Sequence, residues 1–151
     1  RFHLITRIKH LPVTFLGANW DSFNSKNRTF LGSHSASDVE RIMRRARIVL
    51  NVTANYFSSH ERVFGGMMQR SAVATFGKNF FSGLDENDND PLFYVTPNNL
   101  DDRLCNLLAN GTELQRRANA GYELAHRHHR WSNRAEALVA MIHESQNILR
   151  G

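Results

Sequence analysis

The sequence predicts an α/β fold in which a parallel sheet of about five strands is flanked by helices, with further helices at the C-terminal end. Short apolar runs alternate with helical patterns along the first two thirds of the chain, as in strand–helix–strand units. Residues 48–52 form a nearly continuous apolar run, which is typical of a strand buried on both faces of a parallel sheet. A length of 151 residues suits one domain with one main core, so we expect residues 1–151 to form a single domain.

The first third of the chain is predicted to hold a short helix and two strands. Residues 2–8 carry apolar side chains at helical spacing, and Pro12 ends that pattern because proline cannot continue a helix. Residues 13–17 and 28–32 are short apolar runs that each stop at a glycine. We therefore expect two short strands, joined by a polar loop.

A capped helix is predicted to lead into the buried strand at residues 48–52. Ser35 or Ser37 can accept a hydrogen bond from the free N–H groups at the start of this helix. Its apolar positions recur every three or four residues, which gives the helix one buried face. The members of this stripe are Val39, Ile42, Met43 and Ala46.

The remaining helices and strands are predicted from the same apolar patterns. We expect a helix from about residue 60 to residue 70, then strands at residues 71–75 and 92–95 with a long loop between them. Three helices complete the chain, and Asn110 with Gly111 separates the first two. Their apolar stripes are Leu100, Leu104, Leu107 and Leu108; Leu114, Ala118, Tyr122 and Ala125; and Ala135, Leu138, Val139, Ile142 and Leu149.

Composition excludes several classes of protein. Cys105 is the only cysteine, which excludes a disulfide framework and a thiolate zinc site. No apolar run approaches the roughly 18–20 residues that a transmembrane helix needs. The sequence does not open with a secretory leader, so we expect a cytoplasmic protein.

The net charge of +5 comes from the first third, where residues 1–50 carry 9 basic and 3 acidic side chains. Such a segment attracts anions, including nucleotides and nucleic acid. An equally simple interpretation is a solvated basic helix face. The sequence lacks the aromatic stacking platform or helix-turn-helix signature of nucleic-acid-binding proteins, so nucleic acid is not the expected partner. The basic side chains concerned are Arg41, Arg44, Arg45 and Arg47.

A ligand site is expected where the strands end, because open parallel sheets bind ligands outside the carboxyl ends of their strands. Asn51 and Thr75 lie at two such ends. The following helix starts near His60, and the free N–H groups and positive dipole of a helix N-terminus suit a phosphate. Arg62 adds a guanidinium for a pyrophosphate, and Glu61 can accept hydrogen bonds from ribose or sugar hydroxyls.

Glycines complete this candidate site, since Gly65 and Gly66 let a ligand or the backbone approach closely. The alternative is purely structural: a serine and Glu61 favour the helix start, and Arg62 is solvated. The full set of candidate substrate-binding residues is Asn51, Ser59, His60, Glu61, Arg62, Gly65, Gly66 and Thr75.

No metal site is expected. His126, His128 and His129 cluster near the end of a helix, but no cysteine pair or carboxylate is placed to complete a zinc site. Residues 85–90 resemble a calcium loop, yet Asp90 stands where the loop needs a glycine. Both segments are interpreted as polar surface.

Several segments together resemble a known family. Residues 45–52 (RARIVLNV), 60–64 (HERVF) and 72–75 (AVAT) resemble, in order and spacing, the C-terminal half of GT-B glycosyltransferases. The similarity extends to residues 128–134 (HHRWSNR), which lead into the last helix, and to the opening strand at residues 11–20 (LPVTFLGANW). Within GT-B enzymes the chain is most similar to the spore-maturation-type glycosyltransferase-like group, related to family 4.

The resemblance implies a Rossmann-like domain that binds the nucleotide part of an activated sugar, with residues 60–66 facing diphosphate and ribose. It implies a hexosyltransferase-type activity with a nucleotide sugar as donor substrate, no cofactor and an unidentified acceptor. The acceptor-binding half of such a two-domain enzyme is then expected upstream of Arg1. The residues that carry catalysis are not identified by this resemblance.

Two positions depart from the family pattern. The family usually has a glutamate where this chain has Gly65, and that glutamate holds the ribose hydroxyls; Glu61 lies about one turn earlier. The family usually has a glycine where this chain has Arg70, whose side chain can fill or reshape the pocket. These departures favour an alternative function, a non-catalytic degenerate glycosyltransferase fold used for protein interaction or assembly.

Overall fold

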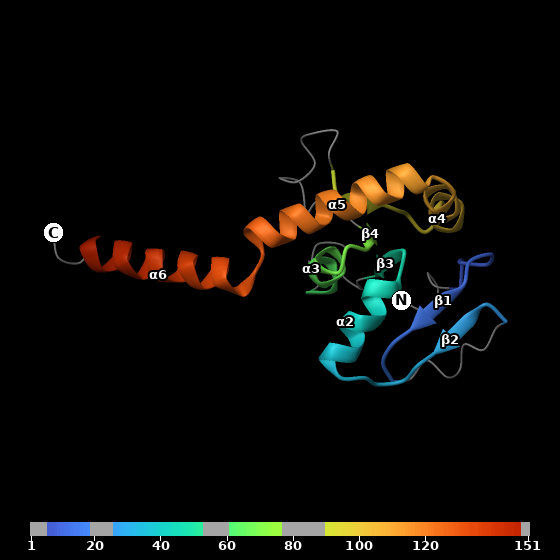
Figure 1. The fold of residues 1–151 in the computed structure, drawn as a ribbon, viewed down its shortest axis with the longest axis horizontal. Helices are drawn as coiled ribbons and strands as arrows, with labels where there is room; N and C mark the ends of the chain where they lie inside the picture. Colours follow the sequence, from blue (N-terminus) through green and yellow to red (C-terminus); the bar gives the residue numbers. More distant parts are fainter. Residues whose placement is uncertain (1–5, 19–25, 53–60, 77–89, 149–151) are drawn as a thin grey trace.

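A computed structural model describes residues 6–18, 26–52, 61–76 and 90–148 of the chain (Figure 1). The α/β class, the parallel strand pairing and the number of strands that the sequence predicts are confirmed. The predicted helix over residues 2–8 is not present in its described part, since residues 6–8 form a turn and irregular backbone.

The described strands pair in parallel but form two separate sheets. The first sheet pairs β1 (Val13–Phe15) with β2 (Arg28–Phe30). The second holds β3 (Ile48–Asn51), β4 (Ala72–Thr75) and β5 (Leu92–Tyr94), in that spatial order. The three-stranded sheet carries the main core. Two of the candidate site residues, Asn51 and Thr75, end its strands β3 and β4.

Within the described residues, five helices accompany these strands, and their ends agree with the sequence signals. Ser35 rather than Ser37 caps the first helix, because its side chain accepts a hydrogen bond from the Asp38 N–H. Asn110 caps a later helix in the same way, through the Glu113 N–H. The helices are α2 (Ala36–Arg45), α3 (Glu61–Met68), α4 (Leu100–Ala109), α5 (Gly111–His128) and α6 (Trp131–Ile148).

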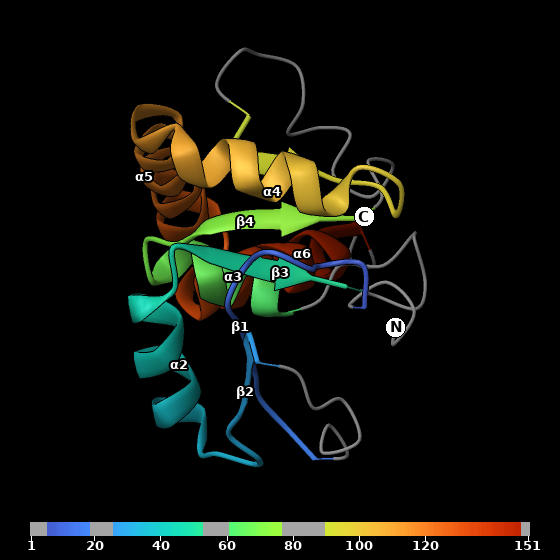
Figure 2. The ribbon, with the colours of Figure 1, turned by 90° about the vertical axis from the view of Figure 1, so that its right-hand side faces the viewer.

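Helices cover both faces of the three-stranded sheet, and side-chain alternation along the strands sends neighbours to opposite faces. Val73 and Leu92 pack with Val63 and Met67, on the face that α3 and α5 cover. The opposite face, where α4 lies against the sheet, gathers a second core (Figure 2). Its buried members are Ile8, Val52, Ala74, Phe76, Phe93, Val95, Leu100, Leu104 and Leu107.

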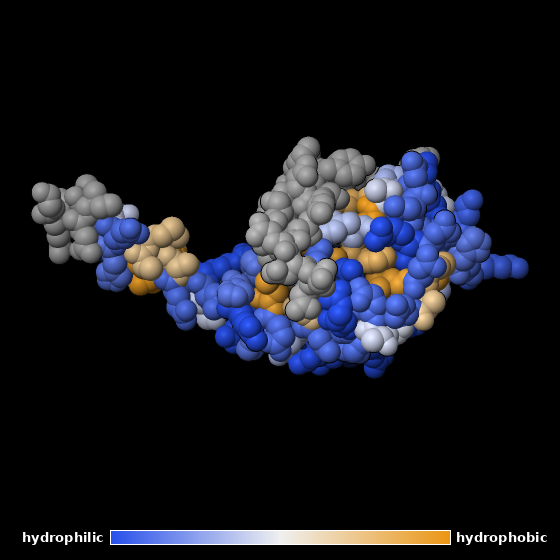
Figure 3. All heavy atoms as spheres, turned by 90° about the horizontal axis from the view of Figure 1, so that it is seen from above, coloured by the Kyte–Doolittle hydropathy of each residue, from blue (hydrophilic) through white to orange (hydrophobic). Residues whose placement is uncertain are grey.

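The last helix, α6, projects away from this body (Figure 1). Its apolar stripe is exposed, with Leu138 at 55% and Ile142 at 47% of their full accessibility. Figure 3 shows the resulting apolar surface on the projecting helix. Within the described residues, no helix combines the length and apolar character needed to cross a membrane.

Candidate functional site

The candidate site is centred on a pair of buried polar side chains at the carboxyl ends of two strands. Asn51 and Thr75 are register partners on β3 and β4. The Asn51 Nδ2 group donates a hydrogen bond to Thr75 Oγ1 at 3.0 Å, and both residues are almost fully buried. The structure therefore brings together two residues that lie 24 positions apart in the sequence.

A third polar side chain extends this pair into a row. Tyr94 on β5 is the register partner of Thr75, so Asn51, Thr75 and Tyr94 lie side by side across the three strands. The Tyr94 hydroxyl is buried, although its ring is partly exposed. We call these three residues the polar row; the sequence analysis did not include Tyr94, because only the strand register places it beside Thr75.

The Asn51 side chain has an unused hydrogen-bonding group. Its Oδ1 atom is buried and accepts no hydrogen bond from the part of the chain that the structure describes. Buried polar atoms in folded proteins nearly always have a partner, so the Oδ1 atom can accept a hydrogen bond from a bound molecule. The Thr75 hydroxyl, by contrast, also donates to the Phe76 carbonyl at 3.3 Å.

Helix α3 begins at the same end of the sheet as the polar row. It follows β3 and leads into β4, so it runs antiparallel to the strands and its N-terminus lies at their carboxyl ends. Glu61 on its first turn is exposed and Arg62 is half-buried. Two of the predicted site residues, Ser59 and His60, lie outside the described residues. Their roles stay predictions.

The two glycines of α3 have different surroundings. A Cβ atom on Gly66 would lie 3.0 Å from Val49 Cβ, so this glycine lets the helix pack closely on β3. A Cβ atom on Gly65 would meet only Met43 Sδ, at 3.7 Å. The close approach at Gly66 is thus between helix and strand, and Gly65 has room for a side chain.

Arg70 does not lie at the carboxyl ends of the strands. It precedes β4, and its guanidinium stacks on the Tyr122 ring of α5, with 3.8 Å between Cζ and the ring centroid. Its φ of 58° is in the left-handed region that favours glycine. The left-handed backbone at this position explains why the family usually has a glycine there, and the Arg70 side chain lies away from the polar row.

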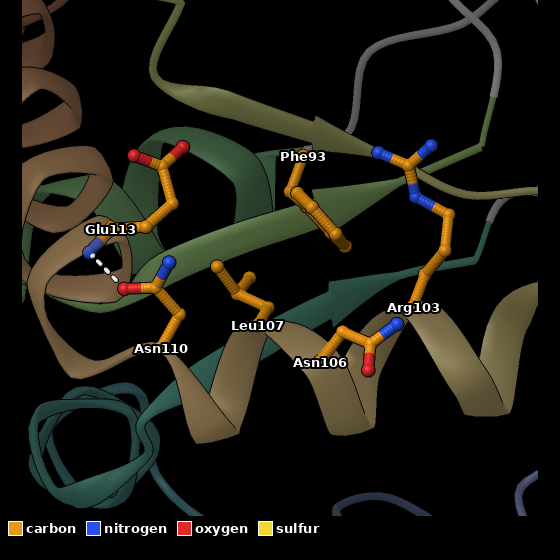
Figure 4. A pocket seen from close by; sticks show the side chains of 6 residues that line it. All are labelled: Phe93, Arg103, Asn106, Leu107, Asn110 and Glu113. Carbon is orange, nitrogen blue, oxygen red and sulfur yellow. Dashed lines mark hydrogen bonds between the residues drawn. The ribbon is translucent and has the colours of Figure 1, made fainter.

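A hollow of about 380 Å³ that the sequence analysis missed lies between α4 and the start of α5. The Phe93 ring faces the Arg103 guanidinium, whose Cζ is 4.6 Å from the ring centroid. Figure 4 shows the lining side chains and the hydrogen bond from the Glu113 N–H to Asn110. None of the lining residues is a predicted site residue: Phe93, Arg103, Asn106, Leu107, Asn110 and Glu113.

Glu113 serves the structure rather than a reaction. Hydrogen bonds from Arg116 lower its pKa to about 2, and Arg117 acts in the same direction against the opposing effect of burial. Arg117 also donates to the carbonyls of Asp90 and Leu92, where β5 begins. This ion-pair cluster ties the start of α5 to the amino end of the sheet.

The predicted histidine cluster also has a packing role. His129 stacks on Phe64 with 4.1 Å between ring centroids, and its pKa is lowered mainly by burial, with Arg134 and His128 adding to the effect. His126 stacks on Tyr122 at 5.4 Å. Among the described residues, no three histidine, cysteine or acidic side chains come together as metal ligands would.

Comparison with known proteins identifies the family of this chain. No individual curated protein matches the chain significantly. The sequence profile of a family described as glycosyl transferase-like, however, matches residues 1–140, which is nearly the whole chain. This chain therefore belongs to the glycosyl transferase-like family.

Proposed function

We propose that this chain is the donor-binding domain of a nucleotide-sugar-dependent glycosyltransferase of the GT-B type, from the spore-maturation-type group. Family membership supports a glycosyltransferase domain. The proposal that this domain binds a nucleotide sugar rests on the polar row, whose buried Asn51 Oδ1 lacks a donor among the described residues. A ligand hydroxyl or N–H group at the carboxyl ends of the strands would supply that donor.

The start of α3 supplies the features that a diphosphate needs. The N–H groups of its first turn and its dipole favour negative charge, and Arg62 adds a guanidinium on the first turn. Glu61, exposed beside it, is suited to accept hydrogen bonds from ribose or sugar hydroxyls. The candidate site thus combines an anion-binding half with a hydroxyl-binding half.

In such an enzyme, the domain acts by positioning the donor and stabilising charge on the leaving diphosphate. Arg62 and the α3 N–H groups would hold the diphosphate as the bond to the sugar breaks. The acceptor and its activating base would come from a second domain. We propose a nucleotide sugar as substrate, no resident cofactor and a cytoplasmic location.

Calorimetric titration with UDP, GDP and their sugars tests this proposal. We expect saturable binding of one nucleotide series, weakened at least about tenfold by Arg62→Ala, because hydrogen bonds to charged groups are the strong ones. Arg41→Ala is the matched control, since Arg41 lies on α2, where it is exposed and paired with Asp38 of the same helix. Absence of binding by every nucleotide at millimolar concentration would contradict the proposal.

The second candidate function is a non-catalytic module for protein interaction or assembly. Gly65 favours it, because the family's usual glutamate is missing there although the position has room for a side chain. Gly65→Glu separates the two functions. Robust nucleotide binding by the unchanged chain supports the enzyme, whereas binding that appears only in Gly65→Glu supports the degenerate module.

A further inference from the structure

We propose a second anion-binding site, at the end of the sheet opposite the polar row, that takes a small molecule carrying two or more phosphate groups. Four arginines line one hollow of about 340 Å³ at this end. Arg44 and Arg45 end α2, Arg47 precedes β3 and Arg70 precedes β4. We call this hollow the arginine pocket.

No carboxylate of the described residues neutralises these four guanidinium groups. The ion pairs found among the described residues involve cations outside the pocket, such as Arg41 with Asp38. The hydrogen bonds of the pocket arginines go to uncharged groups instead. Arg44 Nε donates to Gln69 Oε1 at 2.9 Å, and Arg47 Nη2 donates to the Leu108 carbonyl at 2.9 Å.

The remaining two arginines are placed for binding in different ways. Arg70 stacks on Tyr122 and donates weakly to Asn119 Oδ1 at 3.4 Å, so its guanidinium is held in position without a counter-charge. Arg45 makes no hydrogen bond or ion pair with the described residues. A helix C-terminus favours nearby cations, which accounts for Arg44 and Arg45 but not for Arg47 and Arg70.

The first turn of α5 forms another wall of the pocket. Gly111, the first residue of this 18-residue helix, lines the hollow, and a Cβ atom placed on it would have nothing within 4 Å. The positive end of the helix dipole therefore adds to the field of the four arginines. Arginines from the end of α2 and from the segments before β3 and β4 thus line the same hollow as the N-terminus of α5.

The shape of this site favours a small ligand over nucleic acid. Its volume falls within the roughly 300–1,000 Å³ range of small-molecule sites, and the arginines surround a hollow. A nucleic-acid interface instead spreads its basic residues along a face or stripe. Because four guanidinium groups lack counter-charges among the described residues, a di- or triphosphate fits their charge better than a single phosphate.

Nuclear magnetic resonance titration of the chain with inorganic pyrophosphate and triphosphate tests this inference. The Gly111 amide reports on the arginine pocket, and the Gly66 amide reports on the proposed donor site. The titration uses the Arg62→Ala variant, in which the proposed donor site is weakened. Phosphate binding at the donor site then does not obscure binding at the arginine pocket. We expect saturable shifts of Gly111, at constant ionic strength.

Variants of the pocket give the decisive comparison. Arg45→Ala is expected to weaken the Gly111 response at least about tenfold, Arg45→Lys to weaken it less, and Arg41→Ala to leave it unchanged. An unchanged thermal midpoint of Arg45→Ala shows that the fold is retained. The inference is overturned if Gly111 does not respond, if Arg45→Ala binds as tightly as the parent, or if only an oligonucleotide binds there.

Discussion

Ser71 and Asn51 are both buried polar residues of the same sheet, at its opposite ends. Ser71 lies just before β4, at 2% exposure, and its hydroxyl contacts the carbonyls of Met43 at 2.6 Å and Ala46 at 2.9 Å. Asn51 ends β3 at 1% exposure, and one of its two polar atoms has no partner among the described residues.

The difference separates a structural polar group from a candidate binding group. The Ser71 hydroxyl shares its proton between the Met43 and Ala46 carbonyls and so ties the start of β4 to the end of α2, where the Met43 carbonyl also accepts the Ala46 N–H. Burial of the Asn51 amide contributes less to the stability of the isolated chain, because its Oδ1 accepts no hydrogen bond from the described residues. A polar side chain that does not serve the fold is expected at a functional site.

The largest effect is expected at the structural end of the sheet. Ser71→Ala removes the side-chain donor shared by the Met43 and Ala46 carbonyls, of which Met43 keeps the Ala46 N–H, and should lower the free energy of unfolding by about 1–3 kcal/mol. Urea unfolding measures this change. Ser37→Ala is the control, because Ser37 is exposed and its hydroxyl bonds to the Ser35 hydroxyl, and we expect its effect to stay within about 0.5 kcal/mol. Equal effects of the two substitutions would show that the Ser71 hydroxyl does not stabilise the fold.

The packing that holds α3 over the polar row gives the next effect. Gly66→Ala places a methyl group 3.0 Å from Val49, and we expect a net loss of about 1 kcal/mol after the gain in helix propensity. Gly65→Ala has room and should instead stabilise the protein by about 0.5–1 kcal/mol. Thermal unfolding of both variants measures the contrast, and a stabilising Gly66→Ala would disprove the close helix–strand contact.

The charge cluster at the amino end of the sheet predicts a pH dependence. Because the pKa of Glu113 in the folded chain is about 2, below its ordinary 4.5, this carboxylate contributes stability above pH 4.5. The contribution is lost as the pH falls from about 4.5 to 2, and solvent screening limits it to about 1 kcal/mol.

Glu113→Gln should remove that part of the acid sensitivity. Denaturant unfolding at several pH values in this window would show a flatter curve for the variant than for the parent. Parallel curves would mean that the contacts of Glu113 with Arg116 and Arg117 do not stabilise the fold.

The smallest change in stability is expected at the functional end of the sheet, with the opposite sign. Asn51→Val removes a buried acceptor while Thr75 keeps its bond to the Phe76 carbonyl, so stability should stay the same or rise by less than about 1 kcal/mol. Nucleotide binding should be lost in the same variant. A loss of stability as large as that of Ser71→Ala would show that Asn51 is a structural residue too.

Most of the fold could be predicted from local patterns. The strands at residues 48–52, 71–75 and 92–95 carry runs of apolar side chains, and the helices carry regular stripes and recognisable caps. The helix expected over residues 2–8 was wrong in its described part, where Ile8 packs in the core beside α4. The division into two sheets depends on such long-range pairing.

The site was predictable only in part, for the same reason. The rule that ligands bind at the carboxyl ends of parallel strands leads to Asn51 and Thr75. It does not lead to Tyr94, which joins them only through the register of β5. The arginine pocket was still harder to foresee, since Arg70 lies 23 positions beyond Arg47 in the sequence, and α5 brings Gly111 to both.

The central claim is that a nucleoside diphosphate binds at the polar row beneath the start of α3. The most direct measurement is the response of the Asn51 side-chain amide and the Glu61–Val63 backbone amides to added UDP or GDP, followed by nuclear magnetic resonance. We expect these signals to shift together and to saturate with one of the two nucleotides. Shifts confined to other parts of the chain, or no saturation with either nucleotide, would contradict it.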